Sequence, residues 1–496
     1  MFSLFPYGVL GALFTVVEAI PGLSGVVNRL LINAIVSRAR TRPHPFSTVH
    51  EYTSWRSLTD REWSGRHLPA DQRPSYPDET ALLAMFRRPP GERRLCRKST
   101  CLFPAFAQYL TDGFLRTVSD DQVPDRLKRN TSNHQIDLSP LYGRTHEQTL
   151  ALRVLSEAPG EKGRMKSQMI CDEEFAPFLY AGGKVKPEFD MLDHPLGLSD
   201  LPPGAPHFDR LFAFGGDRAN SVPQVSMMNT LFLREHNRIA GELETREPGW
   251  DDDRVFETAR NIVIVLFIKI VVEEYINHIA PIPFNLRADP SVAWKAEWNK
   301  PNWITTEFSL LYRWHALIPD DITWGGQSRP VRETFLNNAP LIEGGLAQGF
   351  ADMSAQRAGE LGPLNTTESL LHVELASIRQ GRDTSLASFS DYRRYISGKR
   401  PIGFEDVSSD PRVVDVLKSV YDEVEDVEFF PGIFAEDRVP NSPLPRTILS
   451  MVALDAFSQA LTNPLLSQHV FNPRTFSRYG WKLIQETSTL SDILAR

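Results

Sequence analysis

The sequence predicts a mainly α-helical protein with one large body. Apolar residues recur every three or four positions, the spacing of a helix with one buried face, in segments 111–118, 231–244, 255–279 and 411–425. Alternating apolar and polar residues, the pattern of a half-buried strand, are scarce. No composition shift or internal repeat divides the chain after about residue 90. We therefore expect a single catalytic body over residues 43–496, preceded by an entry segment over residues 1–42.

The composition excludes several classes of protein. The 496 residues include 41% hydrophobic and 23% charged side chains, which is typical of a globular protein and excludes wholesale disorder. The net charge is −8 and there is no long basic run, so we expect no nucleic-acid partner. The three cysteines cannot form a disulfide framework, and their odd number favours a reducing compartment.

The entry segment differs from the rest of the chain. Between residues 1 and 20 the only charged side chain is Glu18, and a basic group follows, formed by Arg38, Arg40 and Arg42. The apolar stretch lacks the positive start of a signal peptide. Short apolar helices followed by arginines are typical of a segment that lies in one leaflet of a membrane; alternatively, these helices cap the core. The first interpretation predicts a peripheral, monotopic protein on the cytoplasmic side. The most apolar stretch elsewhere, 262–270, is interrupted by Lys269 and is expected to be a buried core helix.

The sharpest local motif runs from Glu307 to His315 and reads Glu-Phe-Ser-Leu-Leu-Tyr-Arg-Trp-His. Its apolar spacing predicts a helix, on which Tyr312 and His315 would share one face with Cβ atoms about 5–6 Å apart. A buried histidine can ligate haem iron through a neutral ring nitrogen, and a tyrosine one turn away could exchange an electron with that haem. Because such a pair alone is more often simple packing, its surroundings decide the interpretation.

Five further landmarks accompany this motif in a fixed order. They are Tyr52-Thr53-Ser54-Trp55, Phe106-Ala107-Gln108, Asp137-Leu138-Ser139-Pro140-Leu141-Tyr142-Gly143, Leu233-Arg234-Glu235-His236-Asn237-Arg238 and Val427-Glu428-Phe429-Phe430-Pro431-Gly432. With the tyrosine–histidine element, the chain resembles the cyclooxygenase branch of the animal-type haem peroxidases, which includes fatty-acid dioxygenases. The resemblance runs from about Val17 to Leu490. It implies a large helical haem-peroxidase fold with a short amphipathic membrane-binding segment at its N-terminus.

The resemblance implies roles for the motif. His315 would be the proximal ligand of the haem iron, and Tyr312 would become a tyrosyl radical when a hydroperoxide oxidises the haem. That radical would take a hydrogen atom from a doubly allylic carbon of an unsaturated fatty acid, and O2 would add to the carbon radical. Thr111 and Ser221 stand where some relatives esterify their haem to carboxylates, so we expect a non-covalent haem b.

The distal side departs from the family pattern. Gln108 matches, but Asp112 stands where the family has its catalytic histidine. Asp112 would be a base for peroxide activation, or a solvated or helix-capping carboxylate in a protein that has lost this activity. Arg218 resembles the distal arginine that stabilises developing oxygen charge. Phe430 stands where cyclooxygenases place a tyrosine near the free nitrogen of the proximal histidine, which leaves the partner of that nitrogen open.

The substrate channel is also expected from the resemblance. Arg38 is the nearest match to the arginine that binds the fatty-acid carboxylate, although contact with lipid headgroups is an equal alternative. Tyr275 matches the tyrosine that supports the radical tyrosine, and Ile276 and Phe308 are expected to line the channel. Ile282 replaces the tyrosine that partners the channel arginine, so cyclooxygenase activity proper is not expected.

Three functions remain open at this point. The first is a fatty-acid dioxygenase that makes hydroperoxides, which needs Tyr312, His315 and an apolar channel. The second is a haem peroxidase that oxidises small reductants, which needs a competent distal base. The third is a catalytically degenerate haem-binding membrane protein. Relatives are often homodimers, and a homodimer is expected here by that analogy alone.

Overall fold

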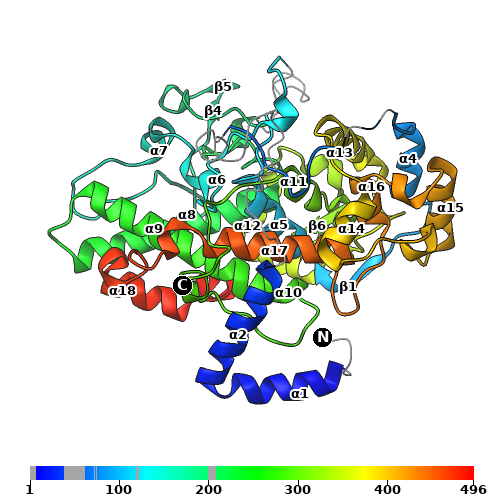
Figure 1. Cartoon of the computed structure of the whole chain (residues 1–496). Helices are drawn as coiled ribbons and strands as arrows, with labels where there is room; N and C mark the ends of the chain where they lie inside the picture. Colours follow the sequence, from blue (N-terminus) through cyan, green and yellow to red (C-terminus); the bar gives the residue numbers. More distant parts are fainter. Residues whose placement is uncertain (1–6, 38–61, 72, 74, 119–121, 199–207) are drawn as a thin grey trace.

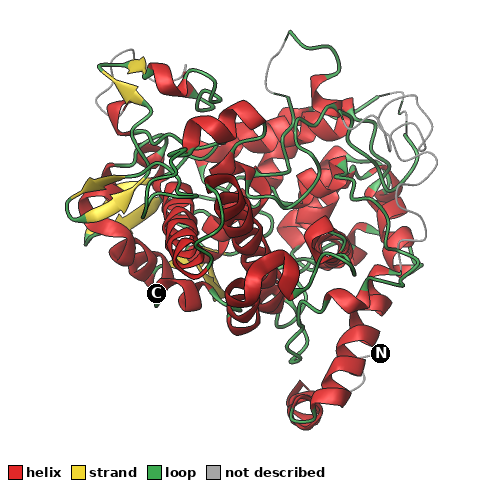
Figure 2. Ribbon diagram, turned by 90° about the vertical axis from the view of Figure 1, so that its left-hand side faces the viewer, coloured by secondary structure: helices red, strands yellow, loops and turns green. Residues whose placement is uncertain are grey.

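The computed structural model describes residues 7–37, 62–71, 73, 75–118, 122–198 and 208–496. Within these ranges the chain is mainly helical, as predicted, and its short strands pair into two-stranded antiparallel ribbons. Figure 2 shows the helices throughout the body and most of the strands near its edge. The fold therefore rests on helix packing rather than on a sheet.

The helices have the following bounds: α1 Tyr7–Glu18, α2 Pro21–Val36, α4 Glu79–Phe86, α5 Leu102–Asp112, α6 Ser139–Tyr142, α7 His146–Leu152, α8 Pro223–Arg246, α9 Asp252–Ile270, α10 Asn277–Ile279, α11 Thr306–Leu311, α12 Ala339–Ala355, α13 Leu371–Asp383, α14 Phe389–Ser397, α15 Pro411–Val420, α16 Phe429–Ala435, α17 Arg446–Leu461, α18 Pro473–Glu486 and α19 Leu490–Leu494. A π-helical turn, Val271–Ile276, joins α9 to α10. The ribbons pair β1 Leu95–Thr100 with β8 Arg357–Gly359, β2 Gln168–Ile170 with β3 Glu173–Phe175, β4 Tyr180–Ala181 with β5 Lys184–Val185, and β6 Asp321–Trp324 with β7 Gln327–Pro330.

Helices α8 and α9 pack against each other in the left half of the body in Figure 1. The side chain of Asp251 caps α9 by accepting a hydrogen bond from the backbone N–H of Arg254 at 2.8 Å. Both α5 and α12 pack on α8, and α18 packs on α9. At Gly480 of α18 an added Cβ would lie 2.3 Å from the side chain of Ile262, so the close approach of α18 to α9 needs a glycine there.

Two of the predicted helical segments are confirmed. Segment 231–244 lies within α8, and segment 255–279 is helical throughout, although its course includes the π-helical turn. The apolar stretch 262–270 is a buried part of α9, as expected. A π-helical turn inserts one residue into the helical repeat and often occurs at functional sites, and here it carries Tyr275 and Ile276.

The other two segments are corrected. Helix α5 ends at Asp112, so the prediction of a helix over 111–118 is wrong. The reason is that side chains of Asn130 and Ser132 donate hydrogen bonds to the carbonyl of Phe114 at 3.2 and 3.0 Å, and Thr117 forms a bridge with Asn130. The helix predicted over 411–425 ends at Val420, after which Tyr421 is extended and its hydroxyl bonds Glu428.

The entry segment forms two helices that project below the body (Figure 1). Helix α2 packs on α17, and the side chain of Asn28 exchanges hydrogen bonds with the backbone of Arg287 at 3.2 and 3.0 Å. Glu18 at the end of α1 accepts a hydrogen bond from the backbone of Asn285 at 2.7 Å. In the described part of the chain, no helix combines the length and the apolar character needed to cross a membrane. The division at residue 42 lies outside the described residues and stays a prediction.

Candidate active site

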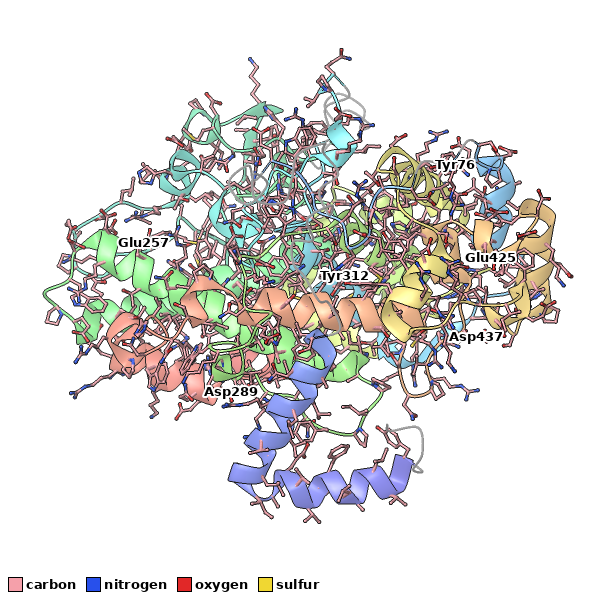
Figure 3. All side chains as sticks on the ribbon, in the orientation of Figure 1. Tyr76, Glu257, Asp289, Tyr312, Glu425 and Asp437 are labelled. Atoms are coloured by element: carbon pink, nitrogen blue, oxygen red, sulfur yellow. The ribbon has the colours of Figure 1, made fainter. Side chains whose placement is uncertain are left out.

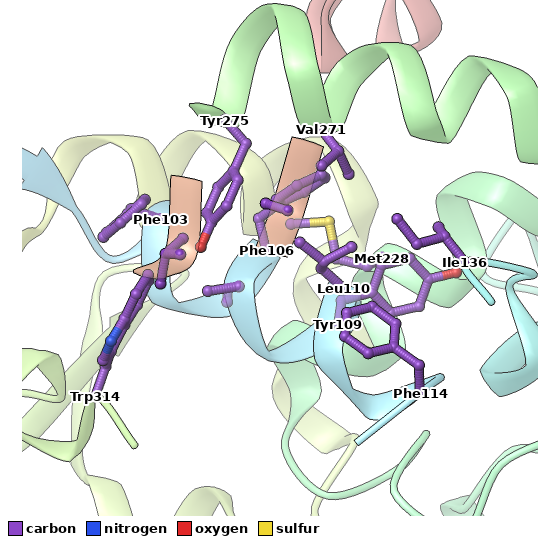
Figure 4. Close-up of a cluster of buried hydrophobic side chains, with 14 of the residues drawn as sticks. Phe103, Phe106, Tyr109, Leu110, Phe114, Ile136, Met228, Val271, Tyr275 and Trp314 are labelled. Carbon is purple, nitrogen blue, oxygen red and sulfur yellow. The ribbon is translucent and has the colours of Figure 1, made fainter. Parts of the chain in front are cut away.

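Helix α5 carries the two residues expected on the distal side. Gln108 and Asp112 are four residues apart and so lie on one face of the helix. The Gln108 amide donates a hydrogen bond to the Ser221 hydroxyl at 2.9 Å. The opposite face of α5 is apolar, and Figure 4 shows Phe106 and Tyr109 among its buried side chains. Core packing of this apolar face therefore fixes the direction of Gln108 and Asp112.

Asp112 is buried, with 7% of its surface exposed, so the alternative of a solvated carboxylate is wrong. Burial raises the pKa of its carboxyl to about 7, against the opposing effect of Arg218, while Asp217 raises it further and Arg116 and Arg313 lower it. Its Oδ2 atom has no hydrogen-bond partner among the described residues. The carboxyl is therefore poised to exchange a proton near neutral pH.

A close backbone contact positions Arg218. The loop that carries it packs on the turn of the Asp137–Gly143 landmark, and at Gly215 an added Cβ would lie 1.9 Å from the backbone nitrogen of Gly143. The backbone N–H of Gly216 also donates to the carbonyl of Pro140 at 3.1 Å. The Arg218 side chain donates to the carbonyl of Leu115, just beyond α5, at 3.0 Å. Two motifs far apart in sequence thus bring Arg218 next to Asp112.

The segment with the candidate proximal histidine is not one continuous helix, and this prediction is wrong. Helix α11 ends at Leu311, and His315 opens a separate 3-10 turn that ends at Leu317. The indole N–H of Trp314 donates to the carbonyl of Leu311 at 2.6 Å, which is the carbonyl that the His315 backbone would use in an α-helix. Tyr312 and His315 therefore both lie beyond the end of α11, in different surroundings, instead of on one face of a helix.

His315 faces a carboxylate. Its Nδ1 atom lies 3.2 Å from Oε2 of Glu374, within ion-pair distance but without the geometry of a hydrogen bond, and neither atom has a hydrogen-bond partner among the described residues. No hydrogen bond engages Nε2 of His315 in the described part of the chain. Sequence reasoning missed Glu374, which belongs to no landmark and lies in the first turn of α13. Phe430, by contrast, stacks on Phe86 at 5.4 Å between ring centroids.

Tyr312 lies near the middle of the body in the view of Figure 3, where it is partly buried and packs against the hydrophobic core. Its ring centroid is 4.7 Å from that of Trp314 and 4.9 Å from that of Phe308. Burial raises the pKa of Tyr312 well above its usual value, and its hydroxyl has no hydrogen-bond partner of good geometry. The phenol is therefore neutral, and its hydroxyl is buried although the Tyr312 side chain as a whole is only partly buried.

Two of the expected channel residues, Tyr275 and Phe308, lie next to Tyr312. Tyr275 is buried and close enough that Tyr312 adds to the rise of the Tyr275 pKa, whose main cause is burial. Its ring packs on Phe103 at 5.5 Å, and Figure 4 shows these two rings beside Trp314. Ile276 and Phe308 are likewise buried. A cavity of about 160 Å³ reaches Tyr275 from the side of α5 and β1. Arg38 lies outside the described residues.

Arg313 connects the two halves of the site. Burial lowers the pKa of its guanidinium to about 10, an effect that Arg218 strengthens and that the carboxyls of Glu374 and Asp112 oppose. Its Nη2 atom donates to Gln380 at 3.2 Å, whereas its Nε atom is unpartnered. Both Asp112 and Glu374 affect the pKa of the Arg313 guanidinium, so this side chain lies near the carboxyls of both the α5 side and the His315 side.

The donor set fits a haem. His315 offers a single imidazole with Nε2 free, and the buried atoms Asp112 Oδ2 and Arg313 Nε lack partners that a bound group could supply. The Thr111 hydroxyl donates to the carbonyl of Ala107 at 3.0 Å and Ser221 accepts from Gln108, so neither position carries a carboxylate for an ester bond. The residues therefore fit a haem held by coordination rather than by covalent bonds.

Comparisons with known proteins agree with this geometry. Prostaglandin G/H synthase 1 of Rattus norvegicus is 29% identical over 477 residues, covering 93% of this chain and 75% of the rat protein. Among solved structures, peroxidase A of Dictyostelium discoideum matches with a TM-score of 0.69 at 19% identity, over 86% of this chain and 89% of that one. The fatty acid alpha-dioxygenase of Oryza sativa, solved with palmitic acid, also gives a TM-score of 0.69, at 17% identity, over 88% of this chain and 80% of that one. At these identities the structures show a shared fold.

The family model named "Animal haem peroxidase" matches residues 85–496, a span that includes α5, the Arg218 loop, the His315 turn and α13. The fold, the ordered landmarks and this match agree, and the chain belongs to the animal haem peroxidase family.

Proposed function

We propose that the protein is a haem-dependent dioxygenase that adds O2 to unsaturated fatty acids and releases fatty-acid hydroperoxides. The observation that carries the proposal is a buried tyrosine hydroxyl, that of Tyr312, which interacts with Tyr275 and lies three residues before a histidine whose Nε2 is free. The relationship to prostaglandin synthases and to a fatty acid alpha-dioxygenase supports a fatty-acid substrate.

His315 would hold a non-covalent haem b through Nε2. When bound, the haem supplies an oxidising equivalent derived from a hydroperoxide. Asp112 takes the proton of the incoming hydroperoxide and returns it to the departing oxygen, because a carboxyl with a pKa of about 7 is populated in both forms near neutral pH. The guanidinium of Arg218 stabilises the negative charge that develops on that oxygen.

Tyr312 performs the hydrogen transfer. Its O–H bond is lost as one electron and one proton, which leaves a phenoxyl radical. The phenoxyl oxygen takes a hydrogen atom from a doubly allylic C–H bond, O2 adds to the carbon radical, and the peroxyl radical regains a hydrogen atom from Tyr312. Trp314 and Phe308 keep water from the phenol, while Ile276 and Tyr275 offer apolar surface to the acyl chain. We assign the substrate carboxylate to Arg38.

A peroxidase that oxidises small reductants is the second candidate. The specific observation in its favour is the buried Asp112 beside Arg218, which is a competent distal pair in itself. The two functions differ in what they require of Tyr312, because a peroxidase needs only the distal groups and the haem. Loss of oxygenation without loss of peroxidase turnover in a Tyr312 variant would separate them. A catalytically degenerate haem-binding protein would show neither activity.

We further propose that the protein binds the cytoplasmic surface of a membrane through α1 and α2. These helices and the turn between them expose large apolar side chains with 41–64% of their surface accessible: Tyr7, Val9, Leu13, Val16, Ile20, Leu23, Val26 and Leu30. The other face of α1 is buried through Leu10, Phe14 and Val17. Two projecting helices with many exposed apolar side chains are the form expected of a segment that lies in a lipid interface.

The first prediction concerns Tyr312. The substitution Tyr312→Phe should lower oxygen uptake with linoleic acid by at least about 100-fold, because phenylalanine has no O–H bond to lose. Haem loading, followed by the Soret band, should stay unchanged. Uptake is measured with linoleic, arachidonic, oleic and palmitic acids, with and without a trace of hydroperoxide. The control is Tyr421→Phe, which removes a buried hydroxyl bonded to Glu428 at 3.0 Å outside the site.

Normal uptake in the Tyr312→Phe protein would refute the radical mechanism. Uptake with saturated palmitic acid but not with linoleic acid would refute the assignment of an unsaturated substrate.

The second prediction concerns the pH dependence of stability. Because the folded-state pKa of Asp112 is raised from 3.8 to about 7, its contribution to stability is present below about pH 4 and is lost as the pH rises to about 7. This interval corresponds to at most roughly 4 kcal/mol. Urea unfolding of the haem-loaded protein and of Asp112→Asn should therefore show wild type losing stability relative to the variant between pH 4 and 7. The exposed Asp415→Asn is the control for removal of one charge, and a constant difference for Asp112→Asn would contradict the assignment.

The third prediction concerns the membrane. The double substitution Leu13→Glu/Val16→Glu places two charges on the exposed apolar face of α1 and should reduce cosedimentation with phospholipid vesicles about tenfold or more. The control is Ile402→Glu, which charges an apolar side chain that is 91% exposed in the loop before α15. Equal cosedimentation of the double variant and wild type, or no vesicle binding by wild type, would contradict the proposal.

A further inference from the structure

We propose that Glu374 is the positioning residue of the proximal histidine. In the haem-loaded protein its carboxylate accepts a hydrogen bond from the Nδ1–H of His315, which makes the imidazole a strong electron donor to haem iron. This inference rests on the proposed ligation of haem by Nε2 of His315. It answers the question that Phe430 leaves open, since a phenyl ring has no polar atom to offer a histidine nitrogen.

The geometry isolates this pair of atoms. Oε2 of Glu374 lies 3.2 Å from Nδ1 of His315, and the side chains are 2% and 19% exposed. The other carboxylate oxygen, Oε1, accepts a hydrogen bond from the hydroxyl of Thr366 at 2.8 Å. Oε1 of Glu374 is thus hydrogen-bonded, whereas Oε2 and the Nδ1 atom of His315 face each other with no hydrogen-bond partner in the described part of the chain, so a small rotation of the imidazole would pair them.

The surroundings favour a negative charge on Glu374. The residue lies in the first turn of α13, where the free N–H groups and the helix dipole stabilise an anion. Arg313 lies close enough that the carboxyl of Glu374 opposes the fall in the pKa of its guanidinium. Burial of an ionised carboxylate without such partners has a high desolvation cost. The Thr366 hydroxyl, the start of α13 and the Arg313 guanidinium offset part of that cost.

One segment holds both members of the pair. The backbone N–H of Thr366 donates to the carbonyl of Phe86 at the end of α4 at 3.0 Å. Its neighbour Asn365 is fully buried, and its side chain donates to the carbonyl of Glu360 at 2.8 Å and to that of Ala316, next to His315, at 3.4 Å. At Gly359 an added Cβ would lie 2.2 Å from the same Ala316 carbonyl, so β8 packs closely against the 3-10 turn His315–Leu317. The distance between His315 and Glu374 is thus fixed from both sides.

The chemical consequence concerns the tautomer and the basicity of the ligand. A hydrogen bond from Nδ1–H fixes the imidazole in the form whose Nε2 lone pair is free for the metal. A charged acceptor draws the Nδ1 proton more strongly than a neutral one, which increases electron density at Nε2. Greater donation stabilises ferric over ferrous iron and lowers the reduction potential of the holoprotein.

The test is the ferric/ferrous midpoint potential of haem-loaded Glu374→Gln. Glutamine keeps the length and an acceptor oxygen but removes the charge, so the potential should rise. We expect a change of at least about tenfold in the equilibrium constant, which is about 59 mV for a one-electron couple. The resonance Raman iron–histidine stretch of the ferrous protein should fall in parallel. The control is Glu368→Gln, which removes a charge from an exposed carboxylate just before α13.

A second pair of measurements leaves Glu374 in place and covers the case in which Glu374→Gln does not fold. In His315→Gly, added imidazole can coordinate the iron and still give an N–H to Glu374, whereas 1-methylimidazole has no N–H to give. The imidazole complex should have the lower potential, again by at least about tenfold in the equilibrium constant.

An unchanged potential in Glu374→Gln, or equal potentials with the two imidazoles, would overturn the proposal. None of these readouts depends on a fatty acid, so failure of the proposed dioxygenase function would be visible separately, in the oxygen uptake of the wild-type protein.

Discussion

The hydrogen bond from the Trp314 indole to the carbonyl of Leu311 is the local constraint on which the site depends. It ends α11 one residue before Tyr312 and lets the chain turn before His315. The tyrosine consequently stays among Trp314 and Phe308, while the histidine reaches Glu374. A continuous helix would have placed both side chains on one face and in one environment. Because α11 ends early, Tyr312 lies in apolar surroundings that suit a radical, and His315, three residues later, lies in polar surroundings that suit a metal ligand.

Buried charge organises the remainder of the site. Asp112 and Glu374 are buried and Arg218 and Arg313 are partly buried, so each of these charges strongly affects its neighbours. Burial keeps the pKa of Asp112 near 7 because Arg218 and Arg313 offset only part of the desolvation cost. The same arginine that moderates Asp112 also lies near Glu374, so a change on the distal side is felt on the proximal side. Burial, which outweighs the effect of these arginines on the pKa of Asp112, explains how an aspartate can occupy the place of a histidine without becoming a permanent anion.

The sequence predicted the helical class, segments 231–244 and 255–279, and the family itself, because these depend on periodicity and on ordered motifs. It did not predict the end of α11, since apolar spacing carries no information about a side chain that takes a backbone carbonyl. Glu374 was invisible for a different reason: it meets His315 only through the path of the chain between β8 and α13. The burial of Asp112, and hence its pKa, likewise arises from tertiary packing.

The central claim is that oxidation of the bound haem reaches a fatty acid through Tyr312. Freeze-quench electron paramagnetic resonance of the haem-loaded protein, produced with ring-deuterated tyrosine and mixed with a hydroperoxide, tests it most directly. The account predicts a tyrosyl radical whose spectrum narrows on deuteration and which disappears when linoleic acid is added without oxygen. A spectrum without a tyrosyl radical, or a radical that persists in the presence of the fatty acid, would contradict it.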